Sequence, residues 1–323
     1  EGIPVRLTGQ DVARGTFSQR HLQLHDVGEG ETWTPRTGRV YTPMANLPGA
    51  TAAFELYNSP LSEAAAVGFE YGYSTHAPET LVIWEAQYGD FANGAQIMID
   101  QFLVSGRAKW GAHSRLTLLL PHGYEGNGPE HSSGRIERFL QLAAEDNMRV
   151  ANCTTAANYF HLLRAQAVTD RLRPLVIFTP KSLLRAKAAS SHLEDLTEGE
   201  FRPVFDDPRV EAPTEVTRLI LCSGKVFHAL DNHPGRADHP ELAIGRVELL
   251  YPLPEDSLKA LFASYPNLTS VTWVQEEPSN MGAWTFVDPL LRDLLPAGVT
   301  LGTDSAEPLG RGRAPSADRR EHF

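Results

Sequence analysis

Short apolar runs rich in β-branched residues alternate with segments of helical periodicity, and this alternation most constrains how the chain folds. The runs are Val5–Thr8, Phe54–Tyr57, Leu81–Glu85, Leu116–Leu120, Arg149–Cys153 and Leu175–Thr179. The helical patterns between them are Leu61–Tyr73, Phe91–Val104, Ser133–Asp146 and Ala156–Thr169. Such alternation is typical of βα units around a mostly parallel sheet, so we expect an α/β fold.

A second, shorter series of the same kind follows. Its predicted strands are "VTRLILCSG", "AIGRVELLYP" and "VTWVQEE", and its predicted helices are Val226–Asn232, Asp256–Ser264 and Trp284–Leu295. The segment 181–214 between the series is polar, holds three prolines and shows no clear strand, so it predicts a linker. We expect two doubly wound three-layer domains with mostly parallel sheets, residues 1–200 and 201–323, and a frayed tail after Leu301.

Composition excludes several classes of partner. The formal net charge of −11 argues against nucleic acid, because phosphate binding needs a basic face. Only two cysteines occur, Cys153 and Cys222, without CxxC spacing, which excludes a disulfide framework and fits the reducing cytoplasm. No run approaches ~18 apolar residues, so we expect no membrane span. The chain begins at Glu1, and we expect it to be part of something longer or a processed product.

Two histidines flank a glycine-rich connection, "PHGYEGNGPEHSSG", after a predicted strand. Ligands of doubly wound sheets bind at the carboxyl ends of strands, where His122 and His131 would lie. An imidazole there can donate, accept or shuttle a proton near neutral pH. The alternative is that both histidines only order the loop through hydrogen bonds. The loop lacks the third glycine of a dinucleotide site, and the chain has no P-loop, zincin or serine-hydrolase motif.

A glutamate and an aromatic pair are the other candidates. Glu63 precedes "AAAVG" in a predicted helix that must pack closely, with Ser59 as its expected cap and Pro60 in its first turn. Glu63 either complements the helix dipole or, if buried, is protonated and donates to a ring nitrogen. Tyr88 and Phe91 follow a strand end, where they pack in the core or form a stacking surface for a flat heterocycle.

Taken together, these segments resemble a known family. The relevant stretches are "RLTGQDVARGTFSQRH", "FELYNSPLSEAAAVGFEYGYS", "IWEAQYGDFANGAQIMIDQF", "LLLPHGYEGNGPEHSSGRIERFLQLAAEDNM", "FTPKSLLR" and "QEEPSNMGAW". In order and spacing, over roughly residues 1–300, they resemble the thiamine-diphosphate-dependent decarboxylating component of 2-oxoglutarate dehydrogenase. The resemblance implies a transketolase-like pyrimidine-binding domain followed by a transketolase-type C-terminal domain.

The resemblance also implies roles for individual residues. A family glutamate matching Glu63 binds the N1′ nitrogen of the cofactor's aminopyrimidine and promotes deprotonation of the thiazolium carbon. Tyr88 and Phe91 resemble the residues that pack against the pyrimidine, with Gln87 beside them. His131 matches the histidine of the "GPxH" loop, which assists proton transfer or holds the acyl adduct. His122 is a second candidate for substrate contact, without a family role carried over to it.

The implied cofactors are thiamine diphosphate and Mg²⁺. In the superfamily the diphosphate and metal are held by a domain with a GDG…NN motif, and this chain has neither half of that motif, so no metal ligand is assigned here. We expect a companion N-terminal half or subunit and a homodimer-type interface. The implied reaction, in the tricarboxylic acid cycle, is decarboxylation of 2-oxoglutarate and transfer of succinyl to lipoyl. Its partners would be a lipoyl-bearing succinyltransferase and dihydrolipoyl dehydrogenase of a multienzyme complex.

Other interpretations stay open. The chain could be a β-subunit-like part of a pyruvate or branched-chain 2-oxo acid dehydrogenase, a non-oxidative decarboxylase or carboligase relative, or a non-catalytic regulatory or scaffold half. Arg164, Lys181, Ser182 and Arg185 resemble the acetyl-coenzyme A activator region of actinobacterial relatives. The alternative for these four residues is a set of solvated polar groups where two domains meet.

Overall fold

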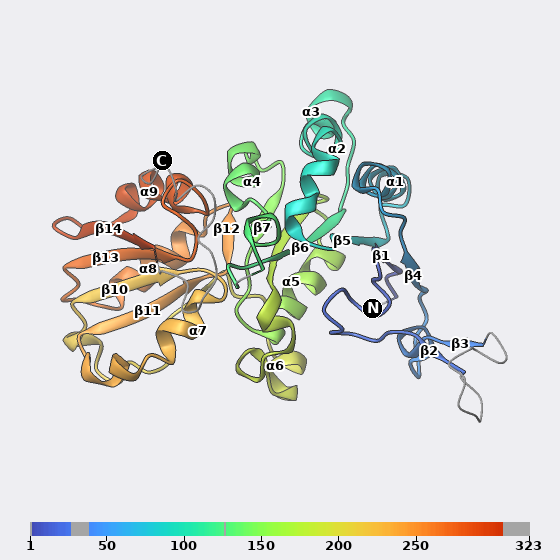
Figure 1. The fold of residues 1–323 in the computed structure, drawn as a ribbon. Helices are drawn as coiled ribbons and strands as arrows, with labels where there is room; N and C mark the ends of the chain where they lie inside the picture. Colours follow the sequence, from blue (N-terminus) through green and yellow to red (C-terminus); the bar gives the residue numbers. More distant parts are fainter. Residues whose placement is uncertain (1, 27–38, 126, 306–323) are drawn as a thin grey trace.

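The computed structural model describes residues 2–26, 39–125 and 127–305, and its larger sheet has seven strands (Figure 1). Their order across the sheet is β12-β7-β8-β6-β5-β1-β4. The bounds are β1 Val5–Gly9, β4 Phe54–Asn58, β5 Leu81–Glu85, β6 Thr117–His122, β7 Arg149–Ala151, β8 Leu175–Pro180 and β12 Leu249–Tyr251. β12 runs antiparallel to β7, and the other neighbours pair in parallel.

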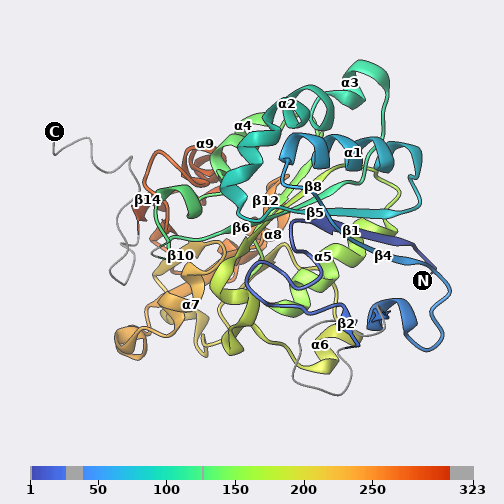
Figure 2. The ribbon, with the colours of Figure 1, turned by 45° about the vertical axis from the view of Figure 1, so that its right-hand side comes forward.

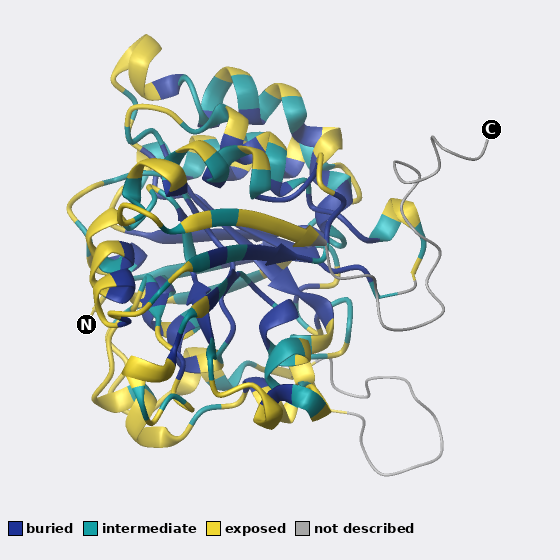
Figure 3. Ribbon diagram, turned by 90° about the vertical axis from the view of Figure 1, so that its left-hand side faces the viewer, coloured by how far each residue is buried: buried dark blue, intermediate teal, exposed yellow. Residues whose placement is uncertain are grey.

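Helices cover both faces of this sheet. One face carries α1 Glu63–His76, α2 Gln96–Met98, α3 Gly106–Trp110 and α4 Ile136–Leu142, and the other carries α5 Ala156–Val168 (Figure 2). Every residue of β5, β6 and β8 is buried, as expected for parallel strands covered on both sides. Figure 3 shows buried strands in the interior of the molecule and exposed residues mainly in the layers outside them.

The smaller sheet has five strands in the order β14-β13-β10-β11-β9. Their bounds are β9 Val204–Phe205, β10 Arg218–Cys222, β11 Leu242–Val247, β13 Ser270–Gln275 and β14 Thr300–Ser305. The flanking helices are α7 Val226–Asp231, α8 Glu255–Ala263 and α9 Trp284–Leu294. Only β9 pairs antiparallel among these described strands. The predicted α/β class with mostly parallel sheets is confirmed.

Several predicted elements differ from those observed. The predicted linker contains α6 Leu193–Thr197 and the edge strand β9. The first residues after Leu301, for which a frayed tail was predicted, continue β14 as far as Ser305. Residues 306–323 lie outside the described part. The predicted helix Phe91–Val104 is a 3-10 segment Gly89–Ala95, then α2, then a π-turn Ile99–Leu103. A two-stranded ribbon, β2 Leu24–His25 with β3 Val40–Tyr41, was not predicted.

Two corrections concern single residues. The N-cap of α1 is Ser62 and not Ser59, because the Ser62 hydroxyl accepts from Ala65 N at 3.4 Å. The predicted strand "AIGRVELLYP" divides at Glu248 into β11 of the smaller sheet and β12 of the larger one. Glu248 is fully buried and accepts from Thr154 N at 2.8 Å, so its carboxylate turns toward the larger sheet.

The two sheets share one hydrophobic cluster. It includes Phe139 and Phe178 from the larger sheet and its helices, together with Trp273 and Leu261 from the smaller one. Packing is therefore continuous between the two sheets, and the division into two domains near residue 200 stays a prediction from the sequence. Among the described residues, no helix is long and apolar enough to cross a lipid bilayer.

Candidate active site

The candidate residues gather at one edge of the larger sheet. Gln87, Tyr88 and Phe91 follow the carboxyl end of β5, and His131 lies in the connection after β6. β5 and β6 are parallel neighbours, so both connections leave the same edge. This is the edge where doubly wound sheets bind ligands.

Four aromatic rings form a cluster at this edge, called the ring cluster below. The Tyr88 centroid lies 4.3 Å from that of His131 and 5.7 Å from that of Phe91, and Phe91 lies 5.4 Å from His131. Phe17 meets Tyr88 edge-on at 5.4 Å. The His131 side chain is 29% exposed, so one titratable ring of the cluster reaches the surface.

Glu63 lies next to the segment that carries Phe91. It is the first residue of α1, and its Oε2 lies 3.2 Å from where a Cβ on Gly94 would stand. A cavity of about 10 Å³ is lined by both Glu63 and Gln87. The side chain is partly buried, so the glutamate neither faces open solvent nor lies in the core. The structure thus places a carboxyl and an amide group together beside the segment 89–95.

The connection 123–134, of which all residues but Gly126 are described, is called the His131 loop below, and hydrogen bonds join its two ends. Gly123 N donates to Ser132 O at 2.8 Å, and the Ser132 hydroxyl donates to Gly128 O at 2.6 Å. Gly123 and Gly128 have φ of 140° and 95°, a backbone region that side chains disfavour. The sequence of this loop therefore allows a tight turn but does not by itself make the turn rigid.

Two charged side chains outside the loop, Asp90 and Lys181, form hydrogen bonds with its backbone. Asp90 Oδ1 accepts from Ser133 N at 3.2 Å, and Lys181 Nζ donates to the carbonyl of His131. Lys181 Nζ also lies 5.7 Å from the centroid of the Tyr88 ring. Burial raises the pKa of Asp90 and lowers the pKa of Lys181. Sequence reasoning did not assign either contact.

His122 lies behind the loop, 2% exposed, and not on the ring cluster. Its Nε2 is 2.7 Å from Glu277 Oε1, and its Nδ1 accepts from Gly134 N at 3.0 Å. Burial opposes a charge on this ring, but the hydrogen bond and charge of Glu277 favour it, and the balance raises the pKa of His122. The Gly134 N–H contact opposes this shift, because it requires Nδ1 without a proton, and the geometry on both sides of the ring is that of the neutral form. Both ring nitrogens form contacts within the chain, so neither is available to a substrate, although His122 was a candidate for substrate contact.

The residues suggested as an activator site differ in exposure and in the segments that they contact. Arg164 is exposed on α5, whereas Lys181 is 5% exposed and belongs to the His131 loop contacts. Ser182 N donates to Glu125 Oε1 at 3.2 Å, which also ties it to that loop. The structure does not bring Lys181 to the surface with Arg164.

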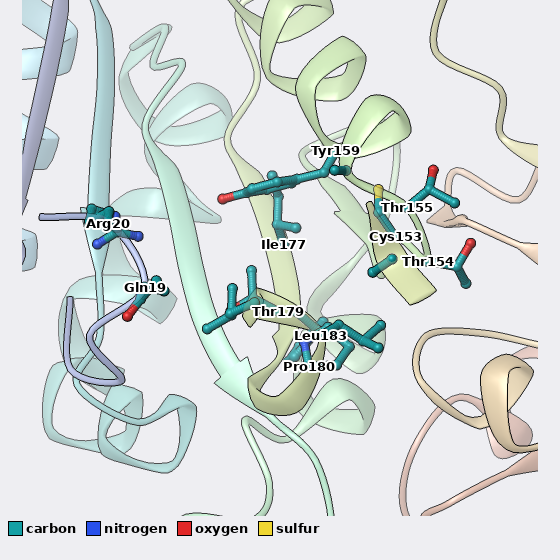
Figure 4. A pocket seen from close by; sticks show the side chains of 14 residues that line it. Gln19, Arg20, Cys153, Thr154, Thr155, Tyr159, Ile177, Thr179, Pro180 and Leu183 are labelled. Atoms are coloured by element: carbon teal, nitrogen blue, oxygen red, sulfur yellow. The ribbon is translucent and has the colours of Figure 1, made fainter. Parts of the chain in front are cut away.

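A second cavity, of about 250 Å³, was not anticipated from the sequence. It lies between the ends of β7 and β8 and the start of α5, and Figure 4 shows the Tyr159 hydroxyl directed toward Arg20 across it. Arg20 forms two contacts with the buried Glu85, at 2.5 and 2.6 Å. Cys153, also in the lining, is a free buried thiol whose pKa burial raises. No sequence motif spans these separated segments.

Within the described residues, no group of three or more His, Cys, Asp or Glu side chains is placed to hold a metal ion. The groups that the site does offer are the aromatic surface of Tyr88 and Phe91, the partly exposed imidazole of His131, and a carboxyl group next to an amide. These groups can bind a flat heterocycle and exchange protons with it.

Comparisons with known proteins agree with this geometry. Residues 1–187 match the family model of the transketolase pyrimidine-binding domain, and residues 190–319 match that of the 2-oxoglutarate dehydrogenase C-terminal region. The chain is 55% identical over 304 residues to a 2-oxoglutarate dehydrogenase E1 component of Geobacillus kaustophilus, covering 93% of this chain and 31% of that protein. It is 52% identical over 322 residues to the E1 component of Bacillus subtilis, covering 98% of this chain and 33% of that protein.

The chain thus spans about a third of the length of these relatives. Its first matched region contains the ring cluster, Glu63 and the His131 loop, and its second contains Glu277. The chain belongs to the family of the transketolase pyrimidine-binding domain, continued by the C-terminal region of 2-oxoglutarate dehydrogenase.

Proposed function

We propose that this chain supplies one side of a thiamine-diphosphate site in an enzyme that decarboxylates 2-oxoglutarate and transfers succinyl to lipoyl. The observation that carries the proposal is that Glu63 lies beside Gly94 of the segment 89–95, which also carries Phe91 of the ring cluster, at the edge where β5 and β6 end. The relatives compared above are named 2-oxoglutarate dehydrogenase E1 components, which supports the choice of substrate.

The residues present fit an aminopyrimidine ring. Tyr88 and Phe91 offer apolar faces to a flat heterocycle, and Glu63 and Gln87 offer groups that hydrogen-bond ring nitrogens. Gly94 leaves room beside the Glu63 carboxyl that a side chain would fill. Thiamine diphosphate, when bound, supplies the carbon nucleophile for a 2-oxo acid. We assign Mg²⁺ and the diphosphate to a companion region, because the sequence contains neither half of the GDG…NN motif that holds them in the superfamily.

Each residue then has a defined task. Glu63 holds a proton against a ring nitrogen, which needs a carboxyl group shielded from bulk water. The ring cluster excludes water from the reacting groups. His131, partly exposed and tied through its backbone to Lys181, moves a proton or holds the acyl group at the open side.

The proposed assembly includes a companion region, a homodimer-type interface, and a lipoyl-bearing succinyltransferase with dihydrolipoyl dehydrogenase in the cytoplasm. Large apolar side chains exposed on α1, α2, α3 and the turn before α1 support a companion surface. They are Leu61 at 70%, Phe69 at 62%, Ile97 at 70% and Trp110 at 60% exposure. Leu61 stands two residues before Glu63, so a companion that covers Leu61 would lie close to that residue.

The test replaces Glu63 in the assembled enzyme. Glu63→Gln keeps the shape but cannot exchange a proton, so we expect thiamine-dependent turnover of 2-oxoglutarate to fall roughly 100- to 10,000-fold. Glu255→Gln is the matched control, because Glu255 also occupies the first turn of a helix but lies in α8. A mere dipole effect would give both variants the same small loss of stability and full turnover, which would refute the role of Glu63.

The alternative functions have their own outcomes. Faster turnover of pyruvate or branched 2-oxo acids than of 2-oxoglutarate would select the β-subunit interpretation. No turnover of any 2-oxo acid by the assembled protein would select a scaffold. Isothermal titration of this chain alone with thiamine diphosphate and Mg²⁺ should show no tight binding, and tight binding would contradict the assignment of the diphosphate elsewhere.

A further inference from the structure

A buried polar pair crosses the interface between the two sheets directly behind the His131 loop. His122 ends β6 of the larger sheet, and Glu277 follows β13 of the smaller one. Both side chains are nearly inaccessible, at 2% and 7% exposure, and their atoms Nε2 and Oε1 are 2.7 Å apart. Neither the sequence patterns nor the proposed function gives this pair a role.

The other side of the His122 ring is attached to the loop. Its Nδ1 accepts from the backbone N–H of Gly134, three residues after His131. Because Nδ1 accepts, Nε2 carries the hydrogen that faces Glu277, so one contact fixes the tautomer that the other needs. The imidazole is thus a fixed link between the smaller sheet and the end of the loop.

The segment around Glu277 is itself rigidly held. The Gln275 side chain donates to Glu277 O at 3.2 Å and to Met281 O at 2.7 Å. Gly282 N donates to Glu137 Oε2 at 3.0 Å, which joins the same segment to α4 just after the loop. These bonds fix the backbone that carries Glu277, so its carboxylate is a stationary partner for His122, whereas the loop contains glycines at positive φ.

We propose that His122 is a positioning residue, fixed by Glu277 of the smaller sheet, that holds the His131 loop in its working position. The inference rests on the proposed role of His131 in the reaction. In this proposal the C-terminal region takes part in the reaction indirectly, because its Glu277 carboxylate holds the His122 ring that positions the loop.

The test separates the two contacts of His122. In His122→Asn the amide lies at the δ position, so its oxygen can still accept from Gly134 N while the contact to Glu277 is lost. In His122→Gln the amide lies at the ε position, so it can reach Glu277 but not Gly134. Glu277→Leu removes the anchor without touching the loop, and Glu277→Gln retains an acceptor oxygen.

Two readouts are compared in the assembled enzyme: amide hydrogen exchange of the segment 122–134, and kcat with KM for 2-oxoglutarate. Glu277→Leu and His122→Gln should lose exchange protection at Gly134, with kcat reduced roughly 10- to 100-fold. Glu277→Gln should restore both readouts toward the unsubstituted enzyme, and His122→Asn should keep more protection at Gly134 than His122→Gln. KM should change much less than kcat, because cofactor and substrate contacts remain.

Glu248→Gln is the matched control, because Glu248 is another buried acid at the same interface that contacts Thr154 and not the loop. It should lower stability without altering exchange in 122–134. Equal exchange and equal kcat in Glu277→Leu and Glu248→Gln would overturn the inference, as would lost protection with unchanged kcat. If even the unsubstituted enzyme fails to turn over 2-oxoglutarate, the proposed function falls, and unchanged exchange in Glu277→Leu still refutes the anchor.

Discussion

Gly89 is the position where a single methyl group should disturb the site most directly. It lies between Tyr88 and the rest of the 3-10 segment that carries Phe91. A Cβ at Gly89 would stand 2.7 Å from Pro121 O and 2.8 Å from Gly134 Cα. Ordinary contacts begin near 3.4 Å, so these two distances are short by about 0.7 and 0.6 Å. Both obstructing atoms are backbone atoms, so no side chain can rotate away.

The expected cost of Gly89→Ala follows from this geometry. Overpacking a close contact typically costs about 1–3 kcal/mol, so the free energy of unfolding should fall by that amount. The methyl also separates the segment 89–95 from the end of the His131 loop. Since a misplacement of ~1 Å can cost about 100-fold in rate, we expect turnover of the assembled enzyme to fall roughly 10- to 100-fold.

The assay compares urea unfolding and 2-oxoglutarate turnover for Gly89→Ala and Gly72→Ala. Gly72 lies in α1 with nothing within 4 Å of an added Cβ, so alanine there should stabilise the helix by roughly 0.5–1 kcal/mol and leave turnover unchanged. If Gly89→Ala were as stable and as active as the unsubstituted enzyme, the close approach of the two connections would not constrain the site.

Two further predictions concern buried charges. Arg20→Met should lower the free energy of unfolding by about 3–5 kcal/mol, because it leaves the Glu85 carboxylate buried without its partner. The double variant Arg20→Met/Glu85→Gln should then be more stable than Arg20→Met alone, and equal stability would refute this explanation. Burial raises the pKa of Glu248 above 4.5, so the folded protein binds this proton more tightly than the unfolded chain does. The free energy of unfolding should therefore lose this contribution as pH rises through the folded pKa. Glu248→Gln removes this titration, and its stability relative to the unsubstituted protein should therefore improve from pH 4.5 to pH 7.5 in urea unfolding; parallel curves would contradict the assignment.

Much of the larger sheet could be predicted because its central strands β5, β6 and β8 are mainly apolar and buried along their whole length. Leu81–Glu85 was predicted with its observed bounds, and Ala156–Val168 differs from the predicted helix by one residue. Segments rich in glycine were less predictable. "GDFANGA" became a 3-10 segment instead of the start of a helix, since its packing against α1 and the end of β6 outweighed its helical spacing.

The candidate site divides in the same way. Glu63, Tyr88, Phe91 and His131 could be singled out from residue type and position after strands, and their roles remain proposals. Lys181 was singled out only through the resemblance to an activator region, and Asp90 and Glu277 were not singled out. Their contacts with the loop and with His122 join separate segments of the chain, which the sequence does not reveal. His122 was noticed for its position in the sequence, but its contacts depend on a residue 155 positions away.

Hydrophobic periodicity in the chain specifies most of the sheet strands and longer helices, and it specifies which side chains stand at the carboxyl ends of β5 and β6, because this periodicity is a local property. The tertiary structure alone decided that Glu248 divides one apolar run between two sheets and that Glu277 reaches His122. Those outcomes depend on which buried polar groups find partners once the sheets have packed, and hydrogen bonding between distant segments leaves no periodic trace in the chain.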